Sequence, residues 1–352
     1  MKLKFWSAQL QLAHPWKIAG SPGADSREVV FVELTDSDGV TGRGEAVPSV
    51  RLGESIAGTL RFLATVDADR LAFGDVPGSL AALAALAADS PPRPGVWGAL
   101  NQALLDGAAQ RAGQPLHDYL GLGFREHHHV TSFSIGLDTP ENIRRKTLAA
   151  AAYPILKLKV GDPHDRDNLA ALRAAAPDKP VRADANEAWR TRDEALRQIE
   201  WLAADGNIQF VEQPMPRQTP AVDLAWLRER SPLPLFADES GHTVADVSPC
   251  AEFFHGVNFK LAKTGGLSPA IEALRAARRA GLKTMLGCTI ESSLLISAAA
   301  HLAELADCLD LDGNLLITND PFRGVTAEQG MLSFAAAPAR TGLRVGPRGA
   351  GN

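Results

Sequence analysis

The spacing of hydrophobic positions changes near residue 123. From there to about residue 321, short apolar runs alternate with amphipathic segments of about 10–15 residues. Short apolar runs bounded by turns predict buried strands, and apolar positions three and four residues apart predict helices. Strands are expected at 130–136, 155–160, 181–185, 208–212, 235–238, 257–261, 283–288 and 307–311, with helices at 140–152, 165–176, 192–204, 220–230 and 268–280.

Such an alternation of strands and helices predicts a parallel sheet. Seven or eight repeats of roughly 25 residues favour a closed barrel over an open, doubly wound sheet. No predicted strand is followed by a GxGxxG segment, which further disfavours a dinucleotide-binding fold. We therefore predict an α/β fold, a modified TIM barrel of the (β/α)7β type, over residues 123–321.

The segments on either side of the barrel have a different pattern. Residues 1 to about 50 alternate as in strands, with a turn at 35–39. A helical pattern follows to about residue 120, interrupted at Pro91–Gly95. After residue 321 only short extended segments remain, and the tail from Gly346 is expected to be disordered. We predict an α+β capping domain formed by residues 1–122 together with a returning C-terminal segment, 322–352.

Composition narrows the class of protein only slightly. The chain has 352 residues, 45% of them hydrophobic, and a formal net charge of −5. This mild acidity argues against nucleic acid or an anionic membrane as a partner. Three cysteines are too few and too widely spaced for a disulfide framework. With no apolar leader and no spanning segment recognised, a cytoplasmic protein is expected.

Candidate chemistry begins with Lys157 and Lys159, which are two residues apart in the second predicted strand of the barrel. Residues at i and i+2 share one face of a strand, so two ammonium groups would lie side by side. An edge strand with a solvated lysine face is one explanation. The other is an inward pair at the mouth of the barrel, available for proton transfer or for binding an anion.

Three consecutive strands that follow end in a carboxylate. Asp184, Glu212 and Asp238 are 28 and 26 residues apart, one strand–helix unit each. Active sites of such barrels lie at the carboxyl ends of the strands, and neighbouring strands are roughly 5 Å apart. Three converging carboxylates require a cation, and oxygen ligands favour a hard divalent ion such as Mg²⁺. We predict a site for one Mg²⁺ per subunit at these residues.

A third lysine, Lys260, ends the sixth strand. On an eight-stranded barrel it would lie across the axis from Lys157 and Lys159, with the metal between. One lysine could then remove a proton from one face of a carbon while the other returns a proton to the opposite face. The metal would stabilise the enediolate formed from a carboxylate, and the pKa of the lysines is expected to fall toward about 7–8.

Together these residues resemble the muconate-lactonizing subgroup of the enolase superfamily, whose sites pair a lysine base with Mg²⁺. The resemblance covers essentially the whole chain, and the nearest match within the subgroup is the dipeptide epimerases. It is carried by the Lys-x-Lys strand, the three carboxylates and Lys260, and by four further segments: 50–55, 259–266, 286–293 and 310–313.

The resemblance implies an isomerase that epimerises a dipeptide at the α-carbon of its C-terminal residue by a two-lysine 1,1-proton transfer. It implies Lys159 and Lys260 as acid/base catalysts and Lys157 as a ligand of the substrate carboxylate. Asp310 and Asp312, on one face of the last strand, would hold the α-ammonium of the dipeptide. Further substrate contacts are expected from Ser132, Asn186, Cys288 and Arg27, with Glu239 beside the metal ligands.

Two departures concern specificity. Leu52 stands where the family has a tyrosine, and the 18–23 loop lacks the arginine that glutamate-specific members carry. Arg27 is close in sequence and could substitute, since arginine suits a carboxylate side chain. We therefore expect a small-molecule dipeptide whose second residue need not be glutamate. A homo-oligomer is also expected, because oligomers occur in the superfamily.

Several alternatives remain open. The o-succinylbenzoate synthases, N-succinylamino-acid racemases and muconate cycloisomerases share the lysines and metal ligands, but their substrates lack the ammonium group that Asp310 and Asp312 would bind. A Schiff-base aldolase would need one lysine and no three-carboxylate site. A non-catalytic small-molecule-binding barrel is possible on the same fold. The run His127–His129 is expected to be a solvated loop.

Overall fold

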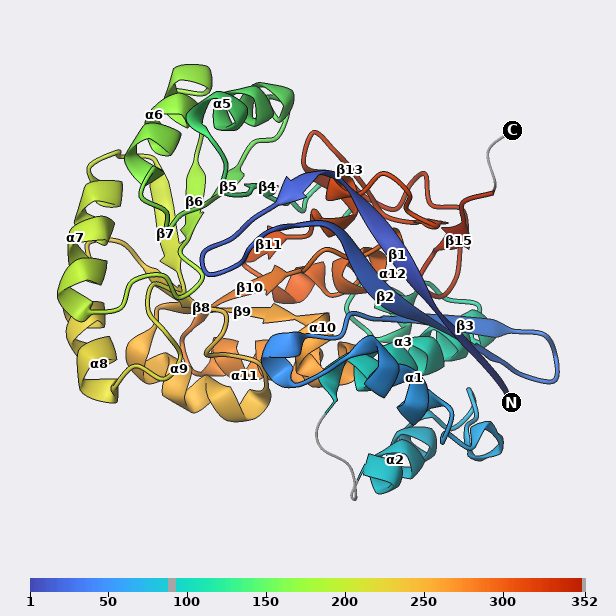
Figure 1. Cartoon of the computed structure of the whole chain (residues 1–352). Helices are drawn as coiled ribbons and strands as arrows, with labels where there is room; N and C mark the ends of the chain where they lie inside the picture. Colours follow the sequence, from blue (N-terminus) through green and yellow to red (C-terminus); the bar gives the residue numbers. More distant parts are fainter. Residues whose placement is uncertain (88–92, 350–352) are drawn as a thin grey trace.

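The computed structural model describes residues 1–87 and 93–349, and the predicted barrel is present (Figure 1). Eight parallel strands follow the order β11-β10-β9-β8-β7-β6-β5-β4. A parallel bridge between Thr131 and Leu309 brings the first and last strands together. The strands are β4 (Phe133–Ile135), β5 (Leu156–Lys159), β6 (Val181–Asp184), β7 (Ile208–Glu212), β8 (Leu235–Ala237), β9 (Gly256–Lys260), β10 (Lys283–Gly287) and β11 (Cys308–Asp310).

Helices connect each strand to the next, which confirms the (β/α)7β architecture. Thr139 and Thr191 cap two of these helices, because their side chains accept hydrogen bonds from backbone N–H groups of the first turn. The helices are α5 (Pro140–Ala149), α6 (Asp165–Ala175), α7 (Arg192–Ala203), α8 (Ala221–Arg230), α9 (Val247–Phe253), α10 (Leu261–Thr264), α11 (Leu267–Arg279) and α12 (Ser293–Ala300).

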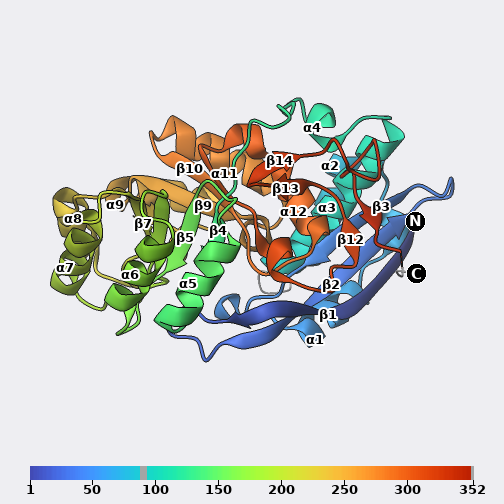
Figure 2. The same ribbon diagram turned by 90° about the horizontal axis from the view of Figure 1, so that it is seen from above.

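The N-terminal region forms the predicted antiparallel sheet, in the order β1-β2-β3. Gly42 and Gly44 of β3 let the backbone of a long helix, α3, pack directly on the sheet, because a side chain at either position would collide with the carbonyl of Ala103 or Ala99. In Figures 1 and 2 this sheet lies to one side of the barrel. The elements are β1 (Lys2–Trp16), β2 (Ala24–Thr35), β3 (Thr41–Ala46), α1 (Ile56–Leu63), α2 (Val76–Ala87), α3 (Pro94–Arg111) and α4 (Leu116–Tyr119).

The C-terminal segment runs back along the N-terminal region. Leu12 bridges to Ile317, just before this segment, and Pro115 bridges to Gly342 within it. Four short strands pair locally, β12 with β15 and β13 with β14. Their bounds are β12 (Phe322–Arg323), β13 (Thr326–Glu328), β14 (Met331–Ser333) and β15 (Gly346–Pro347).

The expected disorder from Gly346 onward is wrong for Gly346–Pro347, because these residues pair with β12 in a register that two residues of pattern could not reveal. Residues 350–352 lie outside the described chain, as do residues 88–92 of the predicted break, after which α3 begins at Pro94. The division into 1–122, 123–321 and 322–352 stays a prediction.

None of the helices in residues 1–87 and 93–349 combines the length and apolar character needed to cross a membrane.

A buried carboxylate, Glu45, joins the β1–β3 sheet to the barrel. It accepts hydrogen bonds from the backbone N–H of Ser292 at 3.0 Å, the hydroxyl of Ser292 at 2.5 Å and the N–H of Leu295 at 3.3 Å. Burial raises the pKa of Glu45 to about 7, although the hydrogen bonds from Ser292 oppose the shift. The folded protein therefore retains this proton at pH values where an unfolded chain has released it.

This raised pKa predicts a pH-dependent loss of stability. Between about pH 4.5 and 7 the folded state binds more protons at Glu45 than the unfolded state, so the free energy of unfolding falls as the pH rises. Glu45→Gln should remove that contribution, which is on the order of 3 kcal/mol. Urea unfolding of both proteins at pH 5 and pH 8 should show the variant gaining stability relative to the wild type at the higher pH.

The exposed Glu328 offers a matched control, since Glu328→Gln removes the same charge from the surface. Its stability should follow that of the wild type at both pH values. An equal effect of Glu45→Gln at pH 5 and pH 8 would contradict the assignment.

Candidate active site

Lys157 and Lys159 of β5 lie inside the barrel, so the edge-strand alternative is wrong. Their exposed fractions are 1% and 7%. Leu156 and Leu158 alternate with them and are buried in the hydrophobic core. A strand with both faces buried has no solvated side on which lysines could lie, so their ammonium groups need carboxylate partners.

Strand register supplies those partners at one level of the barrel. Lys159 is directly opposite Asp184 in β6, and Asp184 is directly opposite Glu212 in β7. On the other side of the barrel, Lys260 of β9 is opposite Gly287 of β10, which is opposite Asp310 of β11. A side chain on Gly287 would collide with the amide of Asn258, so glycine keeps this part of the barrel open.

The ammonium group of Lys157 contacts three carboxylates. Its Nζ lies 2.7 Å from Asp310 Oδ2, 2.8 Å from Glu212 Oε2 and 3.0 Å from Asp184 Oδ2. Lys159 Nζ lies 2.5 Å from Asp184 Oδ2. All of these carboxylates are buried, so the ion pairs form where water screens them least.

Asp238, the third predicted metal ligand, is paired with two lysines. Lys260 Nζ lies 2.8 Å from its Oδ2, and Lys263 Nζ lies 2.6 Å from its Oδ1. From its offset to Lys260, the sequence predicts a loop position for Lys263. The structure has the short helix α10 there, directly after β9, and its turn brings Lys263 back to Asp238 at the end of β8.

These ion pairs raise the pKa of Lys157 and Lys260, which is the direction opposite to the sequence prediction. Burial alone would lower the pKa of Lys157, but Asp184, Asp310 and Glu212 outweigh it and hold the pKa well above its ordinary value. Burial likewise opposes, and Asp238 produces, a raised pKa for Lys260. In the described chain, therefore, the carboxylates hold both ammonium groups in their protonated form.

The three carboxylates have a donor set that fits a hard cation. Glu212 Oε2 is fully buried and receives no hydrogen bond of acceptable geometry, although Lys157 Nζ is close to it, and Glu212 Oε1 accepts from Asn258 Nδ2 at 2.8 Å. Oxygen donors of this kind suit Mg²⁺. As the described side chains stand, no three Asp, Glu, His or Cys residues are arranged so that they could hold a metal ion. Lysine ammonium groups contact each of the three carboxylates instead.

The backbone after two of the carboxylates is strained. Asn186 and Glu187, which follow Asp184, have φ angles of 44° and 68°, and Gln213, which follows Glu212, has 36°. Residues other than glycine rarely adopt such angles, and they cluster at functional sites. Gln213 was missed by the sequence interpretation, yet its Oε1 accepts from the N–H groups of Asp238 and Ser240 and so positions the next strand end.

Asp310 and Asp312 are both buried at the end of the last barrel strand. Asp310 Oδ1 accepts from Ser132 Oγ at 2.7 Å, while Asp312 Oδ2 accepts from Ser134 N at 2.6 Å. Burial, followed by the nearby Asp310 charge, raises the pKa of Asp312 to about 6. Cys288 lies 3.6 Å from Asp312, and burial raises the pKa of its thiol, so the S–H group can donate to the carboxylate.

A cavity of about 430 Å³ lies beside the cluster of buried lysines and carboxylates at the strand ends, between the barrel and the N-terminal region. Asn186, Glu239 and Lys263 line it from the barrel, and Arg51 and Leu52 line it from the other side. The cavity connects to the cluster through Asn186, whose N–H donates to Asp184 Oδ1 at 3.0 Å, and through Lys263. A ligand in this cavity would reach the lysines from the carboxyl ends of the strands.

Arg27 is not among the residues that line this cavity. Its Nη2 donates to the carbonyl of Pro48 at 2.7 Å, and burial lowers the pKa of its guanidinium. The 18–23 loop does reach the cavity, through Ala19 and Gly20. Arg27 thus holds the backbone at Pro48, directly before the lining residue Ser49, and its expected contact with a substrate side chain stays a prediction.

Arg51 is a second residue that the sequence interpretation missed. Its Nη1 donates to Glu239 Oε1 at 2.7 Å and lies 3.5 Å from Glu187 Oε2. Both partners follow the strand ends that carry Asp238 and Asp184. The ion pair therefore fastens the 49–54 loop over the cavity, and the signal in the sequence was a basic residue within the 50–55 segment that resembles the family.

Comparisons with known proteins agree with this geometry. The profile of the family described as "Enolase C-terminal domain-like" matches residues 141–335. The L-Ala-D/L-amino acid epimerase of Pedosphaera parvula is 59% identical over 98% of this chain and 99% of its own. A substrate-liganded L-Ala-D/L-Glu epimerase from Bacillus subtilis superposes with a TM-score of 0.89 at 26% identity, covering 99% of each chain.

A third comparison includes a metal. The dipeptide epimerase of Enterococcus faecalis, in a structure with Mg and the dipeptide L-Leu-L-Tyr, has a TM-score of 0.87 and 27% identity, covering 97% of this chain and 98% of that one.

The Arg51 ion pair gives a prediction for the dynamics of the loop. Arg51→Gln removes a charged hydrogen bond to a buried acceptor, but the arginine is about half exposed, so we expect a loss of roughly 1 kcal/mol. The amides of Leu52, Gly53 and Glu54 are hydrogen-bonded within the loop, and their exchange with deuterium should accelerate about fivefold. Mass spectrometry of a peptide spanning 49–54 measures this.

Arg61→Gln, which removes an exposed arginine from the neighbouring helix α1, is the matched control and should leave the exchange unchanged. Unchanged exchange in Arg51→Gln as well would mean that the ion pair does not hold the loop.

Proposed function

Because this chain belongs to the dipeptide epimerases of the enolase superfamily, we propose that it epimerises a dipeptide at the α-carbon of the C-terminal residue, with Lys159 and Lys260 as the two acid/base catalysts. The observation that carries the proposal is the order of the strands. β5 with Lys159 and β9 with Lys260 are separated by β6, β7 and β8, which end at or just before the three carboxylates.

This order supports a two-face mechanism. A carbon held above the carboxylates would have one lysine on either side, so one removes the α-proton and the other delivers a proton to the opposite face. Inversion at the α-carbon requires this arrangement, whereas a single base returning its own proton would restore the starting epimer. A positioned general base or acid typically raises the reaction rate by about 10²–10⁴-fold.

We assign one Mg²⁺ per subunit to Asp184, Glu212 and Asp238. Their buried oxygens, the orphaned Glu212 Oε2 and the Mg in the Enterococcus faecalis structure support this assignment. When bound, the ion would supply positive charge beside the substrate carboxylate, where negative charge develops as the α-proton leaves. Lys157 contacts Asp184, Glu212 and Asp310, so it is in position to bind the same substrate carboxylate from beside the metal ligands.

The surroundings of Lys260 determine its protonation state. Burial favours the neutral amine, and the negative charge of Asp238 favours the ammonium form. Neutralising Asp238 would leave burial as the dominant influence and bring the pKa of Lys260 down toward the range where it can accept a proton. The pKa of Lys260 thus depends on whether a bound cation neutralises Asp238.

Asp310 and Asp312 favour a dipeptide over the substrates of the related enzymes. We propose that they receive the α-ammonium of the dipeptide, since they are buried acceptors at the end of β11 beside Ser132 and Cys288. The substrates of o-succinylbenzoate synthases, N-succinylamino-acid racemases and muconate cycloisomerases have no such cation. The C-terminal side chain is less restricted, because Arg51 is already bound to Glu239 and the 18–23 loop has no arginine.

Removing one catalyst separates proton exchange from epimerisation. In D₂O with Mg²⁺, Lys260→Ala should lose epimerisation of both epimers by at least about a hundredfold. It should still exchange the α-proton of one epimer, because Lys159 on the opposite face is intact. Mass spectrometry measures deuterium incorporation, and chiral chromatography measures epimerisation in the same samples.

Lys283→Ala, an exposed lysine at the start of β10, is the control and should match the wild type. Equal and complete loss of exchange from both epimers in Lys260→Ala would contradict the two-base mechanism.

A further inference from the structure

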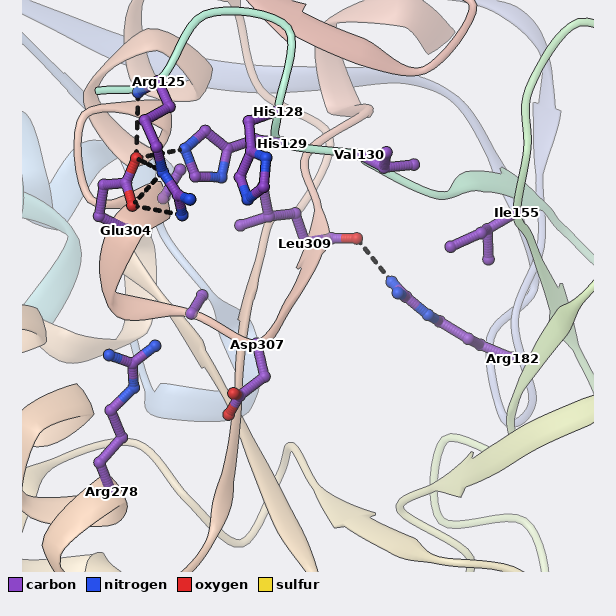
Figure 3. Close-up of a pocket in the computed structure, with 12 residues that line it drawn as sticks. Arg125, His128, His129, Val130, Ile155, Arg182, Arg278, Glu304, Asp307 and Leu309 are labelled. Atoms are coloured by element: carbon purple, nitrogen blue, oxygen red, sulfur yellow. Dashed lines mark hydrogen bonds and ion pairs between the residues drawn. The ribbon is translucent and has the colours of Figure 1, made fainter.

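A second cavity, of about 280 Å³, has the lining residues shown in Figure 3 and opens at the end of the barrel opposite the candidate active site. Ile155 and Asp307 line it, and each immediately precedes a barrel strand, β5 or β11. The active-site residues Lys159 and Asp310 end those same strands. The cavity therefore lies at the amino-terminal mouth of the barrel, where the proposed epimerase reaction has no use for it.

Basic residues are the majority of its polar lining. They are the three arginines Arg125, Arg182 and Arg278, with the imidazoles of His128 and His129, against the two carboxylates Glu304 and Asp307. Of the histidine run that the sequence predicted to be solvated, His129 is in fact buried, with its Nε2 2.9 Å from Glu304 Oε1.

Glu304 is already neutralised. Arg125 donates to it through Nε and Nη2, at 3.1 and 2.9 Å (Figure 3). The hydrogen bond from Arg125 is the main reason that the pKa of Glu304 falls to about 2. Asp307 is also engaged, since its Oδ2 accepts from the N–H and the hydroxyl of Thr284 at 2.8 and 3.0 Å.

Arg182 is the unusual member of the set. Only 3% of it is exposed, yet in the described chain no carboxylate lies within 4.0 Å of its guanidinium, whose hydrogen bonds go to neutral groups. Its Nη1 donates to the carbonyl of Leu309 at 2.6 Å and its Nε to Gln209 Oε1 at 3.1 Å, and Figure 3 shows the side chain pointing toward Leu309. A buried charge without a counter-ion is costly, so an anion in the cavity would relieve that cost.

Arg278, on α11, stands at the open side of the same cavity. It is exposed, and among the residues described it too has no carboxylate within 4.0 Å. Two guanidinium groups that lack acidic partners thus border one small space, one buried and one at the entrance. Guanidinium forks match the oxygens of phosphate and carboxylate groups, often with two hydrogen bonds at once.

We propose that this cavity binds a small oxyanion, a phosphate or a dicarboxylate, between Arg182 and Arg278. Its volume suffices, since an apolar cavity of about 150 Å³ in another protein holds a benzene molecule. A short chain of polar contacts links this cavity to the candidate active site. Arg182 Nη1 lies 3.4 Å from Ser132 Oγ, and the Ser132 hydroxyl donates to Asp310.

Isothermal titration calorimetry of the Mg²⁺-loaded protein tests the proposal, with sodium phosphate and sodium succinate as separate titrants at constant ionic strength. Wild-type protein should bind at least one of the two anions. Arg278→Gln should weaken that binding about fivefold or more. Arg279→Gln removes the neighbouring exposed arginine of α11, which does not line the cavity, and should bind like the wild type.

The choice between the two titrants identifies the chemical class of the ligand. If Arg278→Gln bound the anion as tightly as the wild type, the anion would lie elsewhere and the proposal would be overturned. The proposal would also be overturned if the wild type bound neither phosphate nor succinate. Equal weakening in Arg278→Gln and Arg279→Gln would also overturn it, because the effect would then come from general surface charge.

Discussion

The structure of the barrel depends on the mutual neutralisation of buried lysines and buried carboxylates. Lys157 alone contacts Asp184, Glu212 and Asp310, and Asp238 is held between Lys260 and Lys263. Removing either sign from such a cluster leaves uncompensated charge in a medium of low dielectric constant, which costs several kcal/mol. Packed hydrophobic residues would fill the same space at a lower cost in free energy. We therefore attribute the cluster to the proposed catalytic role and not to stability.

The register of the parallel strands is what makes the cluster compact. Lys159, Asp184 and Glu212 are direct neighbours across β5, β6 and β7, so a shift of one residue in any of these strands would turn a charged side chain into the apolar layer. The left-handed backbone at Asn186 and Gln213 turns the chain sharply after the carboxylates. Rigid strands thus fix the charged groups, while the N-terminal region, fastened by Arg51 and Glu45, forms the other side of the cavity.

The sequence was sufficient for the barrel and for the residues at its strand ends, because apolar strands repeat at a regular interval and each carboxylate or lysine occupies the same place in its repeat. It was insufficient wherever the outcome depends on how distant segments meet. Lys263 returns to Asp238 through one turn of helix, Gln213 acts through its side chain on the next strand, and His129 is buried by its pairing with Glu304. No periodicity reveals such contacts, and the direction of the lysine pKa shifts likewise follows from partners seen only in the folded chain.

The central claim is that this cluster exchanges the α-proton of the C-terminal residue of a dipeptide. The most direct measurement is deuterium incorporation from D₂O across a library of dipeptides and their N-acetylated counterparts, with Mg²⁺ and again with EDTA. We expect one deuterium at the C-terminal α-carbon of the free dipeptides, far less in the acetylated series, and none with EDTA. Absence of exchange throughout the library, or exchange at the N-terminal residue instead, would contradict the claim.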